Sequence, residues 1–218
     1  VFDGKLSDDG SEIVGDWKQA GQSMPLVFKR LAQAPRLNRP QEPGKPYPYS
    51  EEEVTVENRT AGVRLAGTLT LPRGPGPHRA VVLITGSGPQ DRDEAIMGHR
   101  PFLVLADHLT REGIAVLRCD DRGVGKSTGN YGMATGVDFV EDALAAVAYL
   151  RTRPEIDFRR IGLLGHSEGG IFAPRAAVKS KDVAFIVLLA GVGVPMEELL
   201  QRQGRDIALV MGATEPML

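Results

Sequence analysis

A serine lies between two glycines in the segment Gly165-His166-Ser167-Glu168-Gly169, after the apolar run at residues 161–164 and before a helical pattern. The Gly-x-Ser-x-Gly pattern is weak evidence by itself, because glycine and serine are common residues. It indicates a nucleophile when a buried strand enters it and a helix leaves it, since the serine then stands on a sharp, strained turn. The sequence predicts both conditions, so we interpret Ser167 as a nucleophile. The alternative is a plain glycine-rich turn in which Ser167 caps the helix.

A second glycine-rich turn, Thr85-Gly86-Ser87-Gly88, follows the apolar run at residues 80–85. Acyl transfer needs N–H donors aimed at the oxygen that becomes negative, and the loss of one donor costs about 2.7–4 kcal/mol. We predict that the backbone N–H of Ser87 is one such donor, with Gly88 as the substitute, and that the N–H of Glu168 is the other. A tight loop without a catalytic role is the alternative for this turn.

The composition excludes several other functions. The 218 residues carry a formal net charge of −2 and 42% hydrophobic residues, so we expect a globular protein with no nucleic-acid partner. No apolar run approaches the roughly 18 residues of a membrane span. The single cysteine, Cys119, ends an apolar run and is interpreted as a buried strand residue, neither a catalytic thiol nor part of a metal site. Neither Gly86-x-Gly88 nor the segment around Lys126-Ser127 has the glycine spacing of a nucleotide site.

The order of the predicted elements indicates an α/β domain. Residues 53–58 and 62–71 alternate as an antiparallel pair, and continuous apolar runs at 80–85, 114–119, 161–164 and 183–190 predict buried strands. Between them, helical patterns cover 101–112, 135–153 and 168–179, and another covers 196–210. Thr135 and Asp138 form a predicted capping box. Strands that alternate with helices imply a mostly parallel sheet with helices on both faces.

The first fifty residues do not show this alternation of strands and helices. Residues 1–30 contain Asp-Gly and Ala-Gly turns between short alternating runs, which predict the hairpins of a small β domain. Residues 31–50 contain five prolines in the stretch from Pro35 to Pro48, and we interpret them as a linker, with an ordered arm on the next domain as the alternative. Residues 51–218 are then the α/β domain.

Three stretches of residues 51–218 resemble the α/β-hydrolase superfamily, in the order LITGSGPQDRDE, LRCDDRGVGKSTG and RIGLLGHSEGG. The likeness is greatest to bacterial carboxylesterase-like hydrolases related to dienelactone hydrolases. It implies an α/β-hydrolase fold, an oxyanion loop in the first stretch and a nucleophile in the third. It also implies the start of a helical cap at about 195–218. For the second stretch we expect an ion pair between Asp120 and Arg122 that fixes the loop.

The partners that would activate Ser167 are not evident in the sequence. The superfamily order places an acid and then a histidine after the serine. All four histidines of the chain, at 78, 99, 108 and 166, precede Ser167. His166 is expected to point away from the position of a base, and Glu168 and Asp121 are given no acid–base role. We therefore expect a C-terminally incomplete hydrolase domain whose acid and base follow residue 218.

The resemblance implies a serine hydrolase that cleaves carboxylic esters of small molecules, without a metal or organic cofactor. A serine peptidase or amidase on the same scaffold is one alternative, because a fold does not fix a function. A non-catalytic hydrolase-like binding protein is the other. The sequence contains no signal for the cellular compartment or the oligomeric state.

Overall fold

The structure, a computed structural model, describes residues 1–19, 21–33 and 38–213. Residue 20, residues 34–37 of the expected linker and residues 214–218 of the expected cap region lie outside the described residues. The chain divides into two units, Val1–Asn38 and Arg39–Leu218. Each unit has its own sheet, and each is described by itself below.

The first unit is an antiparallel sheet of three strands, β1 (Phe2–Leu6), β2 (Glu12–Gln19) and β3 (Gln22–Lys29), in that spatial order. Gly10 and Gly21 adopt positive φ angles of 67° and 77° in the two connecting turns. Several large apolar side chains of this sheet remain exposed, among them Val14, Met24 and Phe28. The edge-on contact between the rings of Phe2 and Phe28 joins the first strand to the third.

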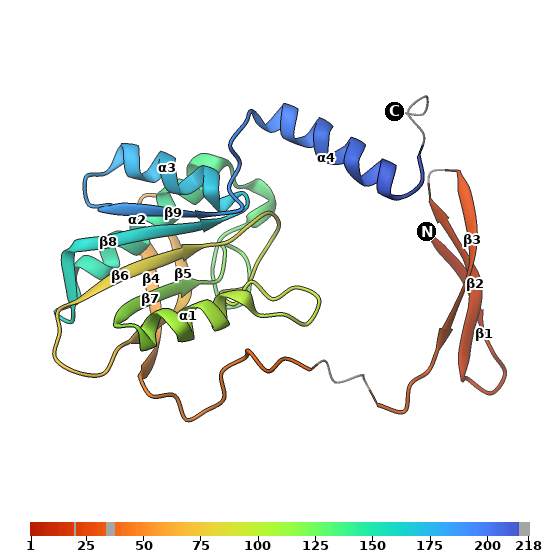
Figure 1. Cartoon of the computed structure of the whole chain (residues 1–218), viewed down its shortest axis with the longest axis horizontal. Coiled ribbons are helices and arrows are strands. Elements are labelled where there is room, and N and C mark those ends of the chain that lie inside the picture. Colours follow the sequence, from red (N-terminus) through yellow and green to blue (C-terminus); the bar gives the residue numbers. More distant parts are fainter. Residues whose placement is uncertain (20, 34–37, 214–218) are drawn as a thin grey trace. The chain divides into compact units, whose positions relative to one another are not determined.

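The second unit is built around a sheet with the strand order β4-β5-β7-β6-β8-β9 (Figure 1). Its strands are β4 (Ser50–Asn58), β5 (Val63–Leu71), β6 (His78–Ile84), β7 (Ile114–Cys119), β8 (Ile156–His166) and β9 (Phe185–Leu189). β4, β5 and β7 pair antiparallel, whereas β7, β6, β8 and β9 run parallel to one another. The sheet is mostly parallel, as the alternation of strands and helices in the sequence predicts.

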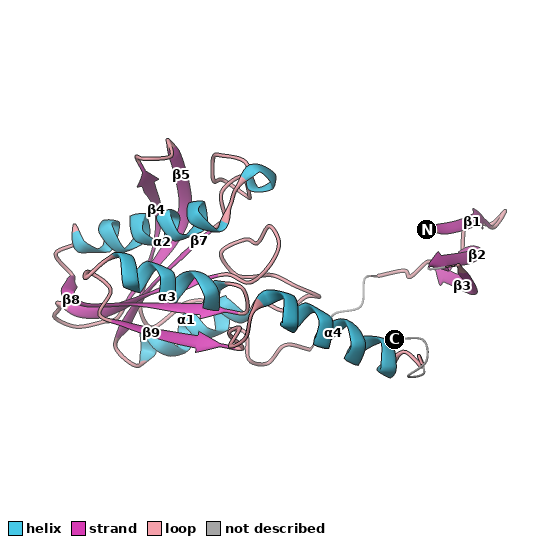
Figure 2. Ribbon diagram, turned by 90° about the horizontal axis from the view of Figure 1, so that it is seen from above, coloured by secondary structure: helices cyan, strands magenta, loops and turns pink. Residues whose placement is uncertain are grey.

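Helices cover both faces of this sheet (Figure 2). α1 (Pro101–Arg111) packs Phe102 and Ala106 against Val81, Val116 and Leu164 on one face. On the other face, α2 (Gly136–Arg151) and α3 (Gly169–Lys179) enclose the larger core. The Thr135 N–H donates to Asp138 Oδ2 at 2.9 Å, as in the predicted capping box. A short 3₁₀ helix, η1 (Tyr131–Met133), precedes α2.

The last helix, α4 (Met196–Val210), has no buried residue. Within the residues that the structure describes, no helix has the length and apolar character that a membrane crossing requires.

Part of the Pro-rich segment belongs to the second unit. The guanidinium of Arg39 donates to the carbonyl oxygens of Met97 and Gly98, and Arg100 pairs with Glu42 at 2.5 Å. Tyr49 is buried, and β4 begins at the next residue. Residues 39–49 therefore lead into the larger sheet along the loop that precedes α1.

The first prediction concerns the larger core. Leu163 on β8 is fully buried, so we expect Leu163→Ala in the full-length gene product to lower the free energy of unfolding by about 2–5 kcal/mol. Val178 on α3 is 92% exposed, and Val178→Ala should change the free energy by less than about 0.5 kcal/mol. Denaturant unfolding measures both values, and equal losses in the two variants would contradict the placement of the core.

Candidate active site

Two turns lie side by side because the strands that lead into them are neighbours. β6 and β8 pair in parallel, with Ile84 opposite Gly165, so both strands end at the same edge of the sheet. The turn that begins at Thr85 therefore meets the turn that contains Ser167. A Cβ built on Gly86 would lie only 3.2 Å from the Cβ of Ser167. Gly86 and Ser167, which are 81 positions apart in the sequence, are thus in contact.

Ser167 stands on a tight turn between β8 and α3. Its φ is +50°, a left-handed conformation that costs a residue with a side chain of the order of 1–3 kcal/mol. Its N–H donates to the carbonyl of Leu189 at 2.9 Å, and its carbonyl accepts from the N–H of Gly170 at 2.9 Å. These two bonds hold the backbone in the strained conformation. Ser167 as a whole is half-buried.

The glycines on either side of Ser167 have no room for a side chain. A Cβ at Gly165 would lie 2.1 Å from the carbonyl oxygen of Gly169, and one at Gly169 would lie 2.5 Å from the carbonyl oxygen of Ile84. In both cases the obstacle is backbone, which cannot move aside as the end of a flexible side chain can. The Gly-x-Ser-x-Gly spacing is therefore required by the close approach of α3 to the ends of β6 and β8.

The predicted oxyanion donors lie on the two touching turns. Within the described part of the chain, neither the N–H of Ser87 nor that of Glu168 donates a hydrogen bond. Glu168 precedes the first residue of α3, where free N–H groups and the helix dipole favour a negative ligand. The N–H of Gly86, in contrast, already donates to Glu94 Oε1 at 2.6 Å. Both N–H groups therefore lack an acceptor among the described residues, and their role as oxyanion donors stays a prediction.

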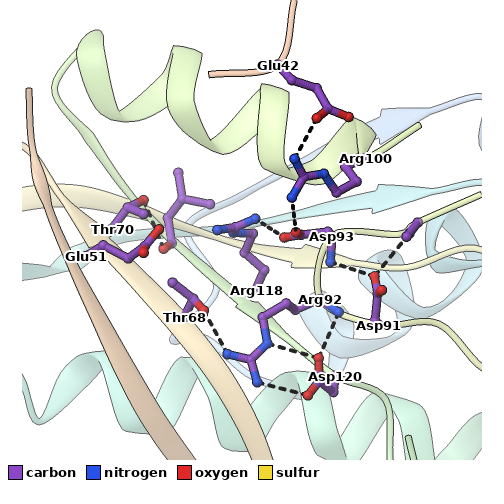
Figure 3. Close-up of polar contacts among 12 residues, drawn as sticks. Glu42, Glu51, Thr68, Thr70, Asp91, Arg92, Asp93, Arg100, Arg118 and Asp120 are labelled. Carbon is purple, nitrogen blue, oxygen red and sulfur yellow. Dashed lines mark hydrogen bonds and ion pairs between the residues drawn. The ribbon is translucent and has the colours of Figure 1, made fainter. Parts of the chain in front are cut away.

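Four charged residues, Asp91 to Glu94, follow the Gly86 turn and connect it to the sheet. Arg92 donates to both oxygens of Asp120 at 2.9 Å (Figure 3). It also donates to Glu53 at 2.9 Å. The next residue, Asp93, pairs with the buried Arg118 of β7. Burial opposes ionisation of Asp120, but the hydrogen bonds from Arg92 hold the pKa of this carboxyl below its usual value. These ion pairs anchor the loop to β4 and β7.

The expected ion pair between Asp120 and Arg122 is wrong. Arg122 instead donates to Asp142 at 2.7 Å and to Asp138 at 2.9 Å, both on α2, while Asp120 pairs with Arg92. Both residues fix the loop after β7, but each does so through a different partner. The sequence could not give this result because the partners lie 16 to 28 positions away.

Asp121 ties the loop after β7 to the loop after β6. Its carboxylate accepts from the Thr85 hydroxyl at 2.8 Å and from the N–H of Gln90 at 3.0 Å. Burial raises the pKa of Asp121 to about 6, and the two hydrogen bonds only partly offset this effect. Sequence reasoning gave Asp121 no acid–base role, and the contacts describe a residue that fixes the start of the Thr85–Gly88 turn.

Glu94 and Tyr131 are residues near the site that sequence reasoning missed. Glu94 is buried, and its Oε1 lies 2.7 Å from Nδ1 of His166. The phenol of Tyr131 has its pKa raised, mainly by burial and also by Glu168 and Asp121, while the Gly88 amide opposes the shift. The unusual density of charge directly after a glycine turn was the available signal for Glu94. No comparable signal marks Tyr131.

Three of the four histidines, at 99, 108 and 166, line one pocket beside the Ser167 turn, but among the described residues none of them contacts the Ser167 hydroxyl through a hydrogen bond. His78 begins β6, His99 forms an isolated bridge with Ile96, and His108 lies in the last turn of α1. His166 is the residue before Ser167, and its contact is with Glu94. Among the described residues, no group of three or more His, Cys, Asp or Glu side chains is arranged to hold a metal ion.

Cys119 does not serve as a nucleophile in this arrangement. Its side chain packs against the larger core, and burial raises the pKa of the thiol to about 12. The thiol is therefore protonated near neutral pH, whereas the thiolate is the reactive form.

A pocket of about 560 Å³ opens beside the turn between β8 and α3 that contains Ser167, which is called the elbow below. Leu189 and His166 form one side of it, and the apolar residues Phe102 and Leu105 of α1 form another. The pocket adjoins the nucleophile turn, because the carbonyl of Leu189 accepts the N–H of Ser167. Its size and lining are typical of a small-molecule site.

The comparisons with known proteins agree with this architecture. Residues 100–214 match the family model described as serine aminopeptidase, S33. The esterase EstD of Thermotoga maritima is 35% identical over 158 residues, which are 72% of this chain and 36% of that protein. The chain thus spans about a third of the length of this curated relative.

Solved structures confirm the fold class. The structure of an esterase from Pyrococcus furiosus has a TM-score of 0.59 and 25% identity, over 77% of this chain and 57% of that chain. The dienelactone hydrolase of Anabaena variabilis has a TM-score of 0.53 and 20% identity, over 66% of this chain and 65% of that chain. The fold is therefore that of the α/β-hydrolases, and the likeness to dienelactone hydrolases extends to their fold.

The second prediction concerns the backbone strain at Ser167. Ser167→Gly relieves a left-handed conformation that Ser167→Ala keeps, so the glycine variant should be more stable than the alanine variant by about 1 kcal/mol. Denaturant unfolding of the two full-length variants gives the difference. An alanine variant as stable as the glycine variant would show that the turn is not strained.

The third prediction concerns the pH dependence of stability that the buried carboxyl of Asp121 causes. Because its folded pKa of about 6 is raised, it stabilises the fold fully below the unfolded value of about 4, and this contribution is lost as the pH rises through 6. The stability of the wild type relative to Asp121→Asn should therefore fall between about pH 4 and 6 and stay level above that range. Unfolding of both full-length proteins across this range tests it, and a difference independent of pH would contradict it.

Proposed function

The chain belongs to the serine aminopeptidase S33 family, which has the α/β-hydrolase fold, and from this premise we propose that it contains the nucleophile of a serine hydrolase that cleaves carboxylic esters. The observation that carries the proposal is the left-handed Ser167 at the carboxyl edge of the sheet, in contact with the Thr85–Gly88 turn. A turn without a catalytic role has no need for strain at this position.

In the proposed reaction, the hydroxyl of Ser167 attacks the carbonyl carbon of the ester while a base takes its proton. The carbonyl oxygen becomes negative and is held by the N–H groups of Ser87 and Glu168. The carbon–oxygen bond to the alcohol then breaks, and the alcohol leaves with the proton from the base. Water attacks the acyl-enzyme in the same way, which releases the acid and restores Ser167.

The base is assigned by the superfamily order, in which a histidine follows the serine and an acid orients it. None of the described histidines is placed by its contacts to serve Ser167. An unassisted serine hydroxyl is a weak nucleophile. The proposal therefore applies to the full-length gene product, and the experiments below use it.

Esters are favoured over amides by the relatives that the chain matches. EstD and the Pyrococcus furiosus protein are both described as esterases. The family description favours the second candidate function, an aminopeptidase that uses the same serine on an amide. Both reactions pass through an acyl-enzyme on Ser167, so they differ in leaving group and not in nucleophile.

The fourth prediction identifies the nucleophile. A fluorophosphonate probe should label Ser167 in the full-length protein, and Ser167→Ala should abolish both the labelling and the hydrolysis of p-nitrophenyl butyrate. Ser87→Ala is the matched control, because it removes the neighbouring hydroxyl but leaves the backbone N–H that the mechanism uses. Mass spectrometry of the labelled peptide locates the probe.

Labelling of another serine, with Ser167→Ala unaffected, would refute the proposal. Parallel assays with p-nitrophenyl butyrate and an aminoacyl p-nitroanilide separate the two candidate functions. We expect a higher kcat/KM for the ester, and the reverse order would favour the aminopeptidase.

A further inference from the structure

The carboxylate of Glu94 joins the two turns of the candidate site. Its Oε1 accepts the N–H of Gly86 at 2.6 Å and lies 2.7 Å from Nδ1 of His166, and the side chain is only 4% exposed. Hydrogen bonds to a carboxylate are stronger than those between neutral groups, and burial strengthens them further. One oxygen atom therefore links the turn after β6 to the residue before Ser167.

The backbone around Glu94 is arranged to aim this side chain. Glu94 has a φ of +52°, a strained conformation for a residue with a side chain. Its N–H donates to the Asp91 carbonyl at 2.9 Å, and the Asp91 carboxylate accepts the N–H groups of Asp93 and Ala95 at 3.0 Å. This closed turn reverses the chain, so that Glu94 faces the elbow while Asp93 faces Arg118 of the sheet.

The contact with Gly86 determines which N–H groups of the turn remain available. Gly86 has its N–H occupied by Glu94, so the next N–H along the chain, that of Ser87, is the first one free to face an oxyanion. A Cβ on Gly86 would lie 3.2 Å from Glu94 Oε1 and 3.3 Å from His166 Nδ1. The Gly86 peptide is thus held on both sides, and its orientation fixes that of the peptide that follows.

The contact with Glu94 also orients the imidazole of His166. Carboxylate oxygens accept hydrogen bonds, so the 2.7 Å contact with Oε1 is a hydrogen bond in the tautomer that carries its proton on Nδ1. The Nδ1–H bond in turn fixes the ring of His166, which lines the pocket beside the elbow. The second oxygen of Glu94, Oε2, is buried and has no hydrogen-bond partner among the described residues. An unpaired buried oxygen is costly, and such exceptions call for an explanation beyond packing.

We propose that Glu94 and His166 are positioning residues for Ser167: the carboxylate holds the Gly86 peptide so that the Ser87 N–H faces the oxyanion, and the imidazole holds the carboxylate. The inference rests on the proposed function. Glu94 is given a positioning role and no part in the bonds that form or break. It acts through the Thr85–Gly88 turn. The hydrogen bond that it orients, from the Ser87 N–H to the carbonyl oxygen of the substrate, is strongest when that oxygen becomes negative in the transition state.

The experiment compares Glu94→Ala and Glu94→Gln in the full-length protein, with p-nitrophenyl butyrate as the substrate. Glu94→Ala should lower kcat by roughly 10²–10³-fold, as the loss of an oxyanion donor does, and leave KM within about threefold. The glutamine carbonyl can still accept the Gly86 N–H, so Glu94→Gln should keep kcat within about tenfold of the wild type. Asp142→Asn is the matched control, because Asp142 is also a buried, hydrogen-bonded carboxylate but lies on α2.

A loss of kcat in Glu94→Ala that Glu94→Gln restores, with kcat unchanged in Asp142→Asn, supports the inference. A kcat for Glu94→Ala within threefold of the wild type overturns it, and so does an equal loss in Asp142→Asn. If Glu94→Ala does not fold, Glu94→Asp replaces it: the charge is kept but the carboxylate is withdrawn from Gly86. Its kcat should then be at least tenfold below that of Glu94→Gln, and equal values overturn the inference.

Labelling of Ser167 in the wild type separates this inference from the function on which it rests. If the fluorophosphonate does not label Ser167, the proposed function fails. If it labels Ser167 at the same rate in the wild type and in Glu94→Ala, the nucleophile stands and the positioning role of Glu94 fails.

Discussion

The parallel pairing of β6 with β8 is the constraint on which the candidate site depends. With Ile84 opposite Gly165, the two strands end at the same level, and the first residues beyond each strand must share a narrow space. A Cβ at Gly169 would lie 2.5 Å from the carbonyl oxygen of Ile84, which excludes a larger residue there, and a Cβ at Gly86 would be tightly packed at 3.2 Å from Ser167. The site is therefore a consequence of strand register. A shift of one residue in β8 would move Ser167 away from the Thr85–Gly88 turn and turn each of its side chains to the other face.

The sequence predicts most of this fold because its signals are local. Continuous apolar runs mark β6, β7, β8 and β9, and the capping box at Thr135 marks the start of α2. The strand–turn–helix context around Ser167 is also local, so the sequence is enough to predict this turn. The approach of the Thr85–Gly88 turn to Ser167 follows once both turns are assigned to the carboxyl ends of neighbouring parallel strands.

The partners of charged side chains could not be predicted in the same way. Arg122 was expected to pair with Asp120, two residues away, but it reaches Asp142 on α2, while Asp120 binds Arg92. Proximity in the sequence is a poor guide here, because successive residues of an extended loop point in different directions. The role of Glu94 was missed for a related reason: its direction depends on a positive φ angle, and no residue-type preference predicts that angle for glutamate.

The segment Asp91–Glu94 shows how a loop can be rigid without regular structure. Asp91 closes the backbone on itself, Arg92 and Asp93 pair with residues of the sheet, and Glu94 turns back to the elbow. Two left-handed residues, Glu94 and Ser167, thus meet at the Gly86 peptide, each at a cost of the order of 1–3 kcal/mol. Strain of this size persists only where the surroundings over-determine the backbone. The ion pairs of Arg92 and Asp93 hold the backbone at Glu94. The packing of α3 against the ends of β6 and β8 holds the backbone at Ser167.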